Sequence, residues 1–290
     1  MAEAMVNRKR FRFNFRGSLC MPYGVFMVLF VILPLLVIVY YAFSDKNGVF
    51  PYFGNWVEFS NFKSNSGSVW DVIGFTLIIS SLTTILCILI AYPIAFLLSN
   101  SKFNKNRVLV YIFLIPMWIN FVVRTVGLRA IVNFISLRLF GQELTVIDNG
   151  TFAILIGMVY DYLPFAILPL YNQMLKMDKN QIEAAADLGA NTFRVFYKVI
   201  IPMTVPGIVS ACMMTFMPTM SSYVIANKMS EGNRQIIGSL IAQYFIEDTS
   251  PGSNNVGSAV ALFLLVAIGI SILIEKLFSG KEDSRKVGIW

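Results

Sequence analysis

An acidic residue inside an apolar stretch is the first feature of this sequence that could do chemistry. Asp161 lies between Tyr160 and Tyr162, three residues before Pro164. A carboxylate near the middle of a membrane is costly and often marks a functional site. Between two tyrosines it could hold an ammonium group through charge pairing and cation–π contact. Pro164 could also free backbone carbonyls that face the same cation.

Two other roles for Asp161 are open. The carboxylate could pair with a basic residue elsewhere in the helix bundle, or it could lie near the outer surface because its span is short. Arg124 would repel a cation from a nearby pathway. We therefore expect Arg124 near the outer surface, where an acidic residue of a loop could pair with it.

Other apolar stretches contribute weaker candidates for the same pathway. Trp118 and Asn120 follow a proline, and Tyr223 follows two serines after another proline. A tryptophan near a proline kink can line a pathway, but tryptophans also anchor at interfaces and pack in cores. The serines beside Tyr223 could equally be helix-packing positions. The candidate substrate-pathway residues are Asp161, Tyr160, Tyr162, Trp118, Asn120 and Tyr223.

The sequence lacks the residues that several kinds of catalytic site require. The sequence has no histidine, which excludes Ser-His-Asp and Cys-His nucleophiles and histidine-based zinc sites. The single Gly-Lys pair, Gly280-Lys281, lacks the glycine and hydroxyl residue of a phosphate-binding loop. The three cysteines form no CxxC pair, and we interpret them as packing residues. We therefore predict no enzyme, no metal and no cofactor of the chain's own.

A polar stretch between two apolar runs has the pattern of two short helices joined by a turn. Glu183 followed by three alanines and Asp187 favours a helix with a small-residue face. Gly189 suits the left-handed position that ends such a helix, and Asn191 can cap the next one. Pro202 fits the start of the following span. We predict a helical elbow over 176–202 that docks into another protein.

The elements that carry these residues are transmembrane helices. The chain has 290 residues, of which 57% are hydrophobic and 13% charged, so we predict an all-α polytopic membrane protein. Long uncharged runs predict a six-span domain over 19–277, followed by a charged tail over 278–290. The predicted spans are about 19–43, 72–98, 108–132, 151–175, 204–227 and 256–275.

The distribution of basic residues predicts the orientation. Most of the 23 lysines and arginines lie in segment 1–18, in the loop after the second span, in the elbow and after the last span. By the positive-inside rule, both termini and the elbow are cytoplasmic in a plasma or inner cell membrane. The basic and aromatic segment 1–18 is interpreted as an anchor at the headgroup layer, and we predict no nucleic-acid partner.

The elbow resembles the permease signature of ABC importers. That signature is EAA, three residues, Gly, nine residues, then Ile-x-Leu-Pro, which here ends in Val199-Ile200-Ile201-Pro202. The resemblance implies the architecture of type I importer permeases and a coupling helix that docks on a separate ATPase subunit. The coupling residues it implies are Glu183, Ala184, Ala185, Asp187, Gly189 and Pro202. Glu183 could pair with a basic residue of the ATPase or stabilise its own helix.

A narrower resemblance points to a transported substrate. Leu114 to Trp118, Val159 to Phe165 and Cys212 to Tyr223 look like the corresponding stretches of PotB-like spermidine/putrescine permeases. The resemblance implies a polyamine importer with a second permease, two ATPase subunits that bind the ATP, and an extracytoplasmic binding protein. Asp161 departs from the family pattern, so its role rests on chemistry. The alternatives are a channel or proton-coupled carrier that uses Asp161, and an ABC importer for sulfate, sugar or thiamine.

Overall fold

The predicted all-α membrane architecture is confirmed. The computed structural model describes residues 21–64, 67–100, 108–144 and 150–286, and these residues are mostly helical. Helices long and apolar enough to cross a membrane are Met21–Ala42, Val69–Ser99, Thr151–Leu175, Thr192–Ser221 and Ser253–Leu273. A bent pair, Leu109–Trp118 and Phe121–Phe140, makes a sixth crossing if it counts as one span. The predicted anchor 1–18 lies outside the described residues.

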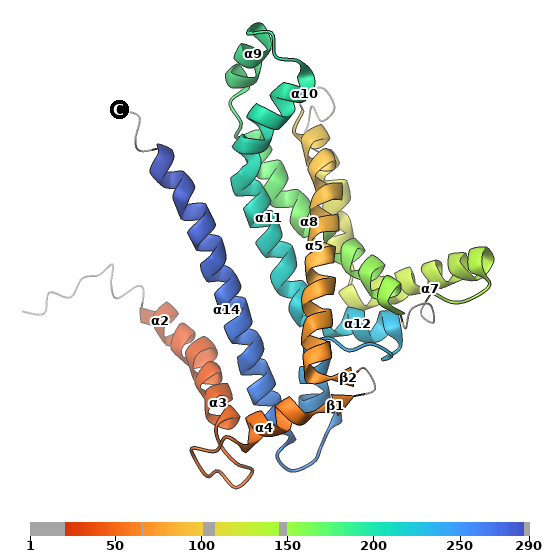
Figure 1. Ribbon diagram of the computed structural model, residues 1–290, viewed down its shortest axis with the longest axis vertical. Helices are drawn as coiled ribbons and strands as arrows, with labels where there is room; N and C mark the ends of the chain where they lie inside the picture. The colour runs from red at the N-terminus through yellow and green to blue at the C-terminus, as the bar shows by residue number, and fades with distance from the viewer. Residues whose placement is uncertain (1–20, 65–66, 101–107, 145–149, 287–290) are drawn as a thin grey trace, which may run out of the picture.

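Three helices form the centre of the bundle (Figure 1). Helix α8 (Thr151–Leu175) packs along both α5 (Val69–Ser99) and α11 (Ile201–Ser221). Small residues allow this approach, because a Cβ atom on Gly207 of α11 would lie 2.6 Å from Cβ of Gln173 on α8. The amide of Gln173 also donates a hydrogen bond of 3.0 Å to the carbonyl of Met203. Close packing and interhelical hydrogen bonds are the attractions that remain between helices in lipid.

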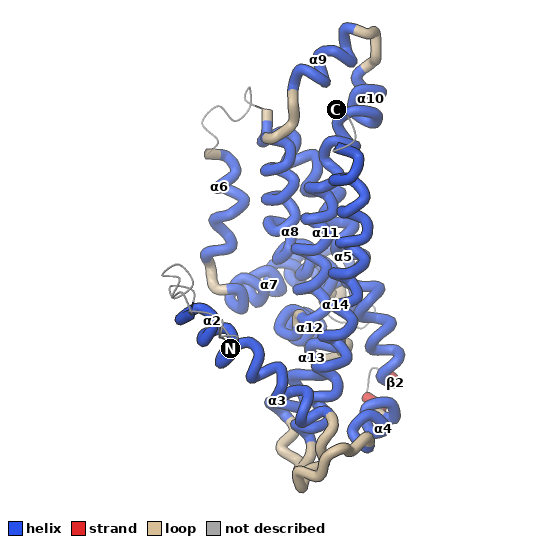
Figure 2. Tube along the Cα trace, turned by 90° about the vertical axis from the view of Figure 1, so that its left-hand side faces the viewer, coloured by secondary structure: helices blue, strands red, loops and turns tan. Residues whose placement is uncertain are grey.

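The third apolar stretch does not form the continuous helix predicted over 108–132. Helix α6 (Leu109–Leu114) and the 3₁₀ turn η2 (Ile115–Trp118) end before α7 (Phe121–Phe140), and the two parts meet at 101°. Asn120 explains the restart, because its side-chain oxygen accepts hydrogen bonds from the backbone N–H groups of Val122 and Val123. Figure 2 shows α6 standing beside the bundle, and Figure 1 shows α7 extending sideways from it.

The fifth span also differs from its predicted limits of 204–227. Helix α10 (Thr192–Val195), the π-helical turn η4 (Phe196–Ile200) and α11 form one helix, so the span begins inside the predicted elbow. Pro202 lies in the first turn of α11, as predicted, but it follows helix and not a loop. The helix ends before Ser222, and α12 (Tyr223–Ser230) begins as a separate element.

The segment between the predicted fifth and sixth spans, 228–255, contains helices. Helix α13 (Ile237–Ala242) and the π-helical turn η5 (Gln243–Glu247) insert Ile237, Leu240 and Tyr244 into a second apolar core. That core also includes Phe59 of α4 (Gly54–Asn61) and residues of α14 (Ser253–Lys286). Helix α14 continues to Lys286. It thus extends past both the predicted end of its span at 275 and the predicted start of the tail at 278.

The first span joins the fold at one end. Its segments are α2 (Met21–Met27), η1 (Val28–Ile32) and α3 (Leu33–Ala42), and α3 packs against α14. A short hairpin of β1 (Lys63–Ser64) and β2 (Gly67–Ser68) leads from α4 into α5. In Figure 1, α4 and this hairpin lie at the end of the bundle opposite α9 (Lys179–Asp187) and α10.

Two buried asparagines fix the end of α3. The amide nitrogen of Asn255 donates to the carbonyl of Ser44 at 2.7 Å, and that of Asn55 donates to the same carbonyl at 2.8 Å. Both also reach the carbonyl of Tyr41 at 3.3 Å. Carbonyls at a helix end have no partner within the helix, so these amides satisfy groups that burial would otherwise leave unpaired.

We predict that Asn255→Ala destabilises the protein while Asn254→Ala does not. The first substitution removes one of the two amide donors to the carbonyls of Ser44 and Tyr41, which costs about 0.5–1.5 kcal/mol, whereas the side chain of Asn254 is exposed. The midpoint of thermal unfolding of the purified protein in detergent should fall for the first variant only. Equal midpoints for the two variants would contradict this role of Asn255.

Candidate functional site

The polar stretch after α8 forms the predicted elbow. Asp178 caps α9 by accepting a hydrogen bond of 3.0 Å from the N–H of Asn180. At the other end, Gly189 has a φ of +79°, as predicted for a left-handed terminating residue. The N–H of Gly189 bonds to the carbonyl of Ala186, and that of Ala190 to the carbonyl of Ala185. This pair of bonds is the Schellman arrangement that ends a helix with an abrupt change of direction.

The second part of the elbow begins at the predicted cap. The side-chain oxygen of Asn191 accepts a hydrogen bond of 2.8 Å from the N–H of Arg194, which starts α10. Figure 1 shows α9 beyond the ends of α5, α8 and α11. The elbow therefore projects from the membrane-spanning bundle.

The exposed face of the elbow contains two large apolar residues that the sequence analysis did not single out. Leu188 is 88% exposed and Phe193 is 77% exposed, on either side of Gly189. Glu183, Ala184 and Asp187 are exposed on the neighbouring helix, while Ala185 is partly buried. Large apolar side chains in contact with water are typical of a surface that binds another protein. Their occurrence within a polar stretch was the sequence signal that could have identified them.

Aromatic contacts tie the elbow to the bundle. Phe196, in the turn after α10, packs edge-on against Tyr92 and Phe96 of α5, with ring centroids 5.8 and 6.1 Å apart. The hydroxyl of Tyr92 lies 2.9 Å from the hydroxyl of Thr204 on α11. A displacement of α10 must therefore move α5 and α11, because close-packed interiors transmit strain.

An apolar groove lies between the elbow and the bundle. Its volume is about 620 Å³, and its walls come from the end of α5, from α9 and from the helix that starts at Thr192. The lining residues are Phe96, Ile182, Ala186, Ala190, Thr192, Phe193, Val195, Phe196 and Ile200. The groove leaves space behind α9, so the elbow contacts the bundle mainly through its second helix.

The buried carboxylate of the fourth span is part of an ion pair. Nε of Arg124 lies 2.6 Å from Oδ1 of Asp161, and both side chains are almost completely buried. The hydroxyl of Thr125 donates to Oδ2 of Asp161 at 2.8 Å. Of the alternatives considered for Asp161, the structure forms the internal pair with a basic residue. The expected pairing of Arg124 with a loop acid is wrong, since its partner lies on α8.

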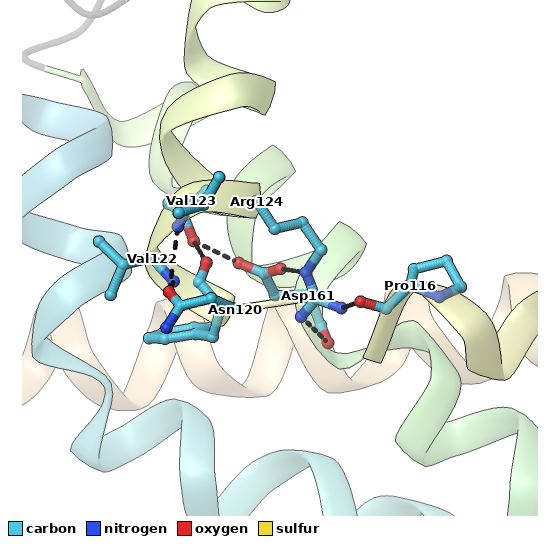
Figure 3. A network of polar contacts seen from close by, with 8 residues as sticks. Pro116, Asn120, Val122, Val123, Arg124 and Asp161 are labelled. Atoms are coloured by element: carbon cyan, nitrogen blue, oxygen red, sulfur yellow. Dashed lines mark hydrogen bonds and ion pairs between the residues drawn. The ribbon is translucent and has the colours of Figure 1, made fainter. Parts of the chain in front are cut away.

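Arg124 also holds the bend between η2 and α7 (Figure 3). One guanidinium nitrogen donates to the carbonyl of Pro116 at 3.0 Å, and another reaches the carbonyl of Asp161 at 3.4 Å. The guanidinium carbon lies 5.6 Å from the ring centroid of Tyr160. One side chain thus links η2, α7 and α8, and Asn120 caps α7 at the same corner.

The structure does not bring the predicted pathway residues together. Tyr162 is buried and its hydroxyl donates to the carbonyl of Pro218 on α11, so the two tyrosines do not enclose Asp161. Tyr160 and Tyr223 are each 41% exposed, and Trp118 at the end of η2 is 87% exposed. These three aromatic side chains remain exposed, whereas Asp161 and Asn120 have structural partners.

We predict that neither charge of the Arg124–Asp161 pair is tolerated in the folded protein without the other. Asp161→Asn leaves a buried guanidinium without its carboxylate, which should cost about 3–5 kcal/mol, whereas replacing both partners by apolar residues can be nearly neutral. The thermal unfolding midpoint should fall in the single variant and largely recover in Arg124→Met/Asp161→Leu.

A matched control is the more exposed pair formed by Arg129 and Glu231. Glu231→Gln should cost no more than about 1 kcal/mol, because solvent screens that pair. If Asp161→Asn matched wild-type stability but lost transport, the result would contradict the structural role and indicate that the carboxylate of Asp161 contacts the substrate directly.

Comparisons with known proteins find relatives of this chain. Residues 88–279 match the family of binding-protein-dependent transport system inner membrane components. The spermidine/putrescine transport system permease protein PotB of Haemophilus influenzae is 30% identical over 89% of this chain and 93% of its own length. PotB of Escherichia coli is 29% identical over 86% of this chain and 92% of its length.

A solved structure has the same fold. It is a bacterial ABC transporter involved in the import of the acidic polysaccharide alginate, and its matching chain superposes with a TM-score of 0.63 at 15% identity. The match covers 91% of this chain and 96% of that one. The type I importer permease architecture is therefore shown. The two curated relatives are transport permeases and not enzymes. This chain is a multi-pass membrane protein that belongs to the family of binding-protein-dependent transport system inner membrane components.

Proposed function

We propose that this chain is one permease subunit of an ATP-driven importer of polyamines such as spermidine and putrescine. The proposal is supported by relatives that carry this function in their names and match nearly the whole chain. Membership of the family removes the channel and the proton-coupled carrier as alternatives. A second related permease, two ATPase subunits and an extracytoplasmic binding protein complete the transporter. ATP is bound by the ATPase subunits.

The exposed elbow is the observation that supports the mechanism. Leu188 and Phe193 offer an apolar contact to a cleft on an ATPase subunit, with Glu183 and Asp187 as polar contacts beside it. Closure of the ATPase pair would draw the elbows of the two permeases together. Phe196 would pass this movement to α5 and α11, and the spans would open toward the binding protein.

The orientation of the chain in the membrane follows from the assignment of the elbow as the contact with the ATPase. The elbow and both termini lie in the cytoplasm, which agrees with the concentration of basic residues on that side. The substrate path lies between the two permeases. Trp118, Tyr160 and Tyr223 are accessible aromatic surfaces that ammonium groups can contact through cation–π attraction. Asp161 acts indirectly, by holding Arg124 and the bent span that carries Trp118.

We predict that Gly189→Val uncouples transport from ATP hydrolysis. A valine at a φ of +79° costs about 1–2 kcal/mol of backbone strain. The strain should displace Leu188 and Phe193 from the positions in which they contact the ATPase. Polyamine uptake by cells that express the transporter should be lost while the protein still reaches the membrane.

Gly141→Val is the matched control for this experiment. Gly141 also has a positive φ, of +70°, and a Cβ atom there meets nothing within 4 Å, but it ends α7 and lies outside the elbow. Its uptake should stay close to wild type. Normal uptake in Gly189→Val would contradict the coupling assignment.

The substrate class is tested separately with the purified complex in liposomes. We predict that ATP hydrolysis is stimulated by the binding protein loaded with spermidine or putrescine. The same protein family could instead serve sulfate, a sugar or thiamine, so binding proteins loaded with those solutes form the comparison. Stimulation by one of them and none by a polyamine-loaded protein would overturn the polyamine assignment and leave the coupling assignment intact.

A further inference from the structure

A group of exposed apolar side chains lies at the end of the bundle opposite the elbow. The members come from the loop after α3 and from α4, and each is more than half exposed. They are Val49 at 60%, Phe50 at 60%, Phe53 at 62% and Val57 at 58%. We refer to these four residues as the apolar loop surface. Exposed groups of this kind mark contacts with a protein or a membrane.

The loop that carries this surface has a fixed shape. The N–H of Asp45 bonds to the carbonyl of Val49 at 3.0 Å, and the N–H of Tyr52 bonds to the carbonyl of Phe43 at 2.8 Å. The carbonyl of Ser44 receives the amides of Asn55 and Asn255. The phenylalanines are therefore held outward by a bonded framework and do not depend on a partner for their position.

The apolar loop surface continues the outer face of the first span. The ring of Phe50 stacks on the ring of Tyr40, with centroids 6.1 Å apart and planes at 16°. The hydroxyl of Tyr40 donates to the carbonyl of Gly48 at 3.3 Å. Tyr40 lies two residues before the end of α3, or about 3 Å along the helix axis. Phe50 therefore lies beside the last turn of a spanning helix.

That span presents almost all of its surface outward. Only 6% of the most apolar window of Met21–Ala42 is buried within the described residues, and the exposed side chains include Leu36 and Val37. The opposite end of the loop is polar, with Lys46 and Asn47 exposed and the amide of Asn47 bonded to Asp45. The loop thus has apolar side chains beside the last turn of the span and a polar turn at Lys46 and Asn47.

We propose that the apolar loop surface inserts into the boundary between lipid headgroups and acyl chains, in the leaflet on the side opposite the elbow. Aromatic side chains favour that layer. Transfer of their apolar surface out of water would stabilise the loop in this position. The four residues carry no charge that burial would have to desolvate. In this position the loop fixes the depth of α3, and through Asn55 and Asn255 it fixes the start of α14 at the same depth.

The test uses nitroxide spin labels on the assembled transporter in lipid nanodiscs. Cys20, Cys87 and Cys212 are replaced, and single cysteines are placed at Phe53 and, independently, at Val49. Collision rates with oxygen, which concentrates in lipid, are compared with those of a water-soluble nickel chelate. Leu36 provides the lipid-exposed reference, and Asn47 in the polar turn provides the aqueous reference.

The proposal expects both loop positions to show a ratio of oxygen to nickel collisions well above that of Asn47 and below that of Leu36, which lies deeper along the span. A ratio equal to that of Asn47 would place the loop in water and overturn the proposal. Low accessibility to both reagents would place the surface under a partner protein, and this outcome would also overturn it. None of these outcomes depends on which solute the transporter carries.

Discussion

A charge buried in a membrane protein needs a partner, and the Arg124–Asp161 ion pair is the contact on which the arrangement of the spans depends. Either charge alone would be costly at this depth, so the pair forces α7 to meet α8 at one register. The same guanidinium binds the carbonyl of Pro116, across the bend. Thr125 gives the carboxylate a further donor. The bend of 101° is thus specified by polar contacts, which have directions that apolar packing lacks.

The elbow works by a different physical principle, because its contacts with the bundle are aromatic and apolar. A Schellman turn at Gly189 and a cap at Asn191 set the angle between its two parts. Phe196 then connects the second part to α5. The apolar groove behind α9 leaves that helix with fewer contacts to the bundle. In the proposed mechanism, α9 and Phe193 bind the partner while Phe196 carries the displacement into the spans.

The two ends of the molecule differ in how they meet their surroundings. At the elbow end, exposed apolar residues lie on a stretch that is otherwise polar and projects beyond the spans. At the opposite end, exposed apolar residues continue the surface of the first span, beside Tyr40. The first position suits a protein partner in water, and the second suits a lipid boundary. Asn55 and Asn255 connect the latter to α14, so this end is held by hydrogen bonds between distant segments.

The membrane class, most of the spans and the local form of the elbow could be predicted from local sequence patterns. The signals were long uncharged runs, a glycine at the end of a helix and an asparagine at the start of the next one. Capping signals of this kind act over a few neighbouring residues, so they can be recognised without knowledge of the tertiary structure. Asn120 carried the same capping signal, but a long apolar run around it favoured a continuous span. Gly189 and Asn191 stood in a polar stretch, where nothing competed with their signals.

The contacts between distant residues depend on how the helices pack. Asp161 and Arg124 are 37 residues apart, and their contact depends on the rotation and depth of two helices. Tyr160 and Tyr162 flank Asp161 in sequence, yet one remains accessible and the other turns to the carbonyl of Pro218. Successive residues of a helix point in different directions, so neighbours in sequence need not share a site. The partner of a buried charge is set by helix packing, which local sequence patterns do not encode.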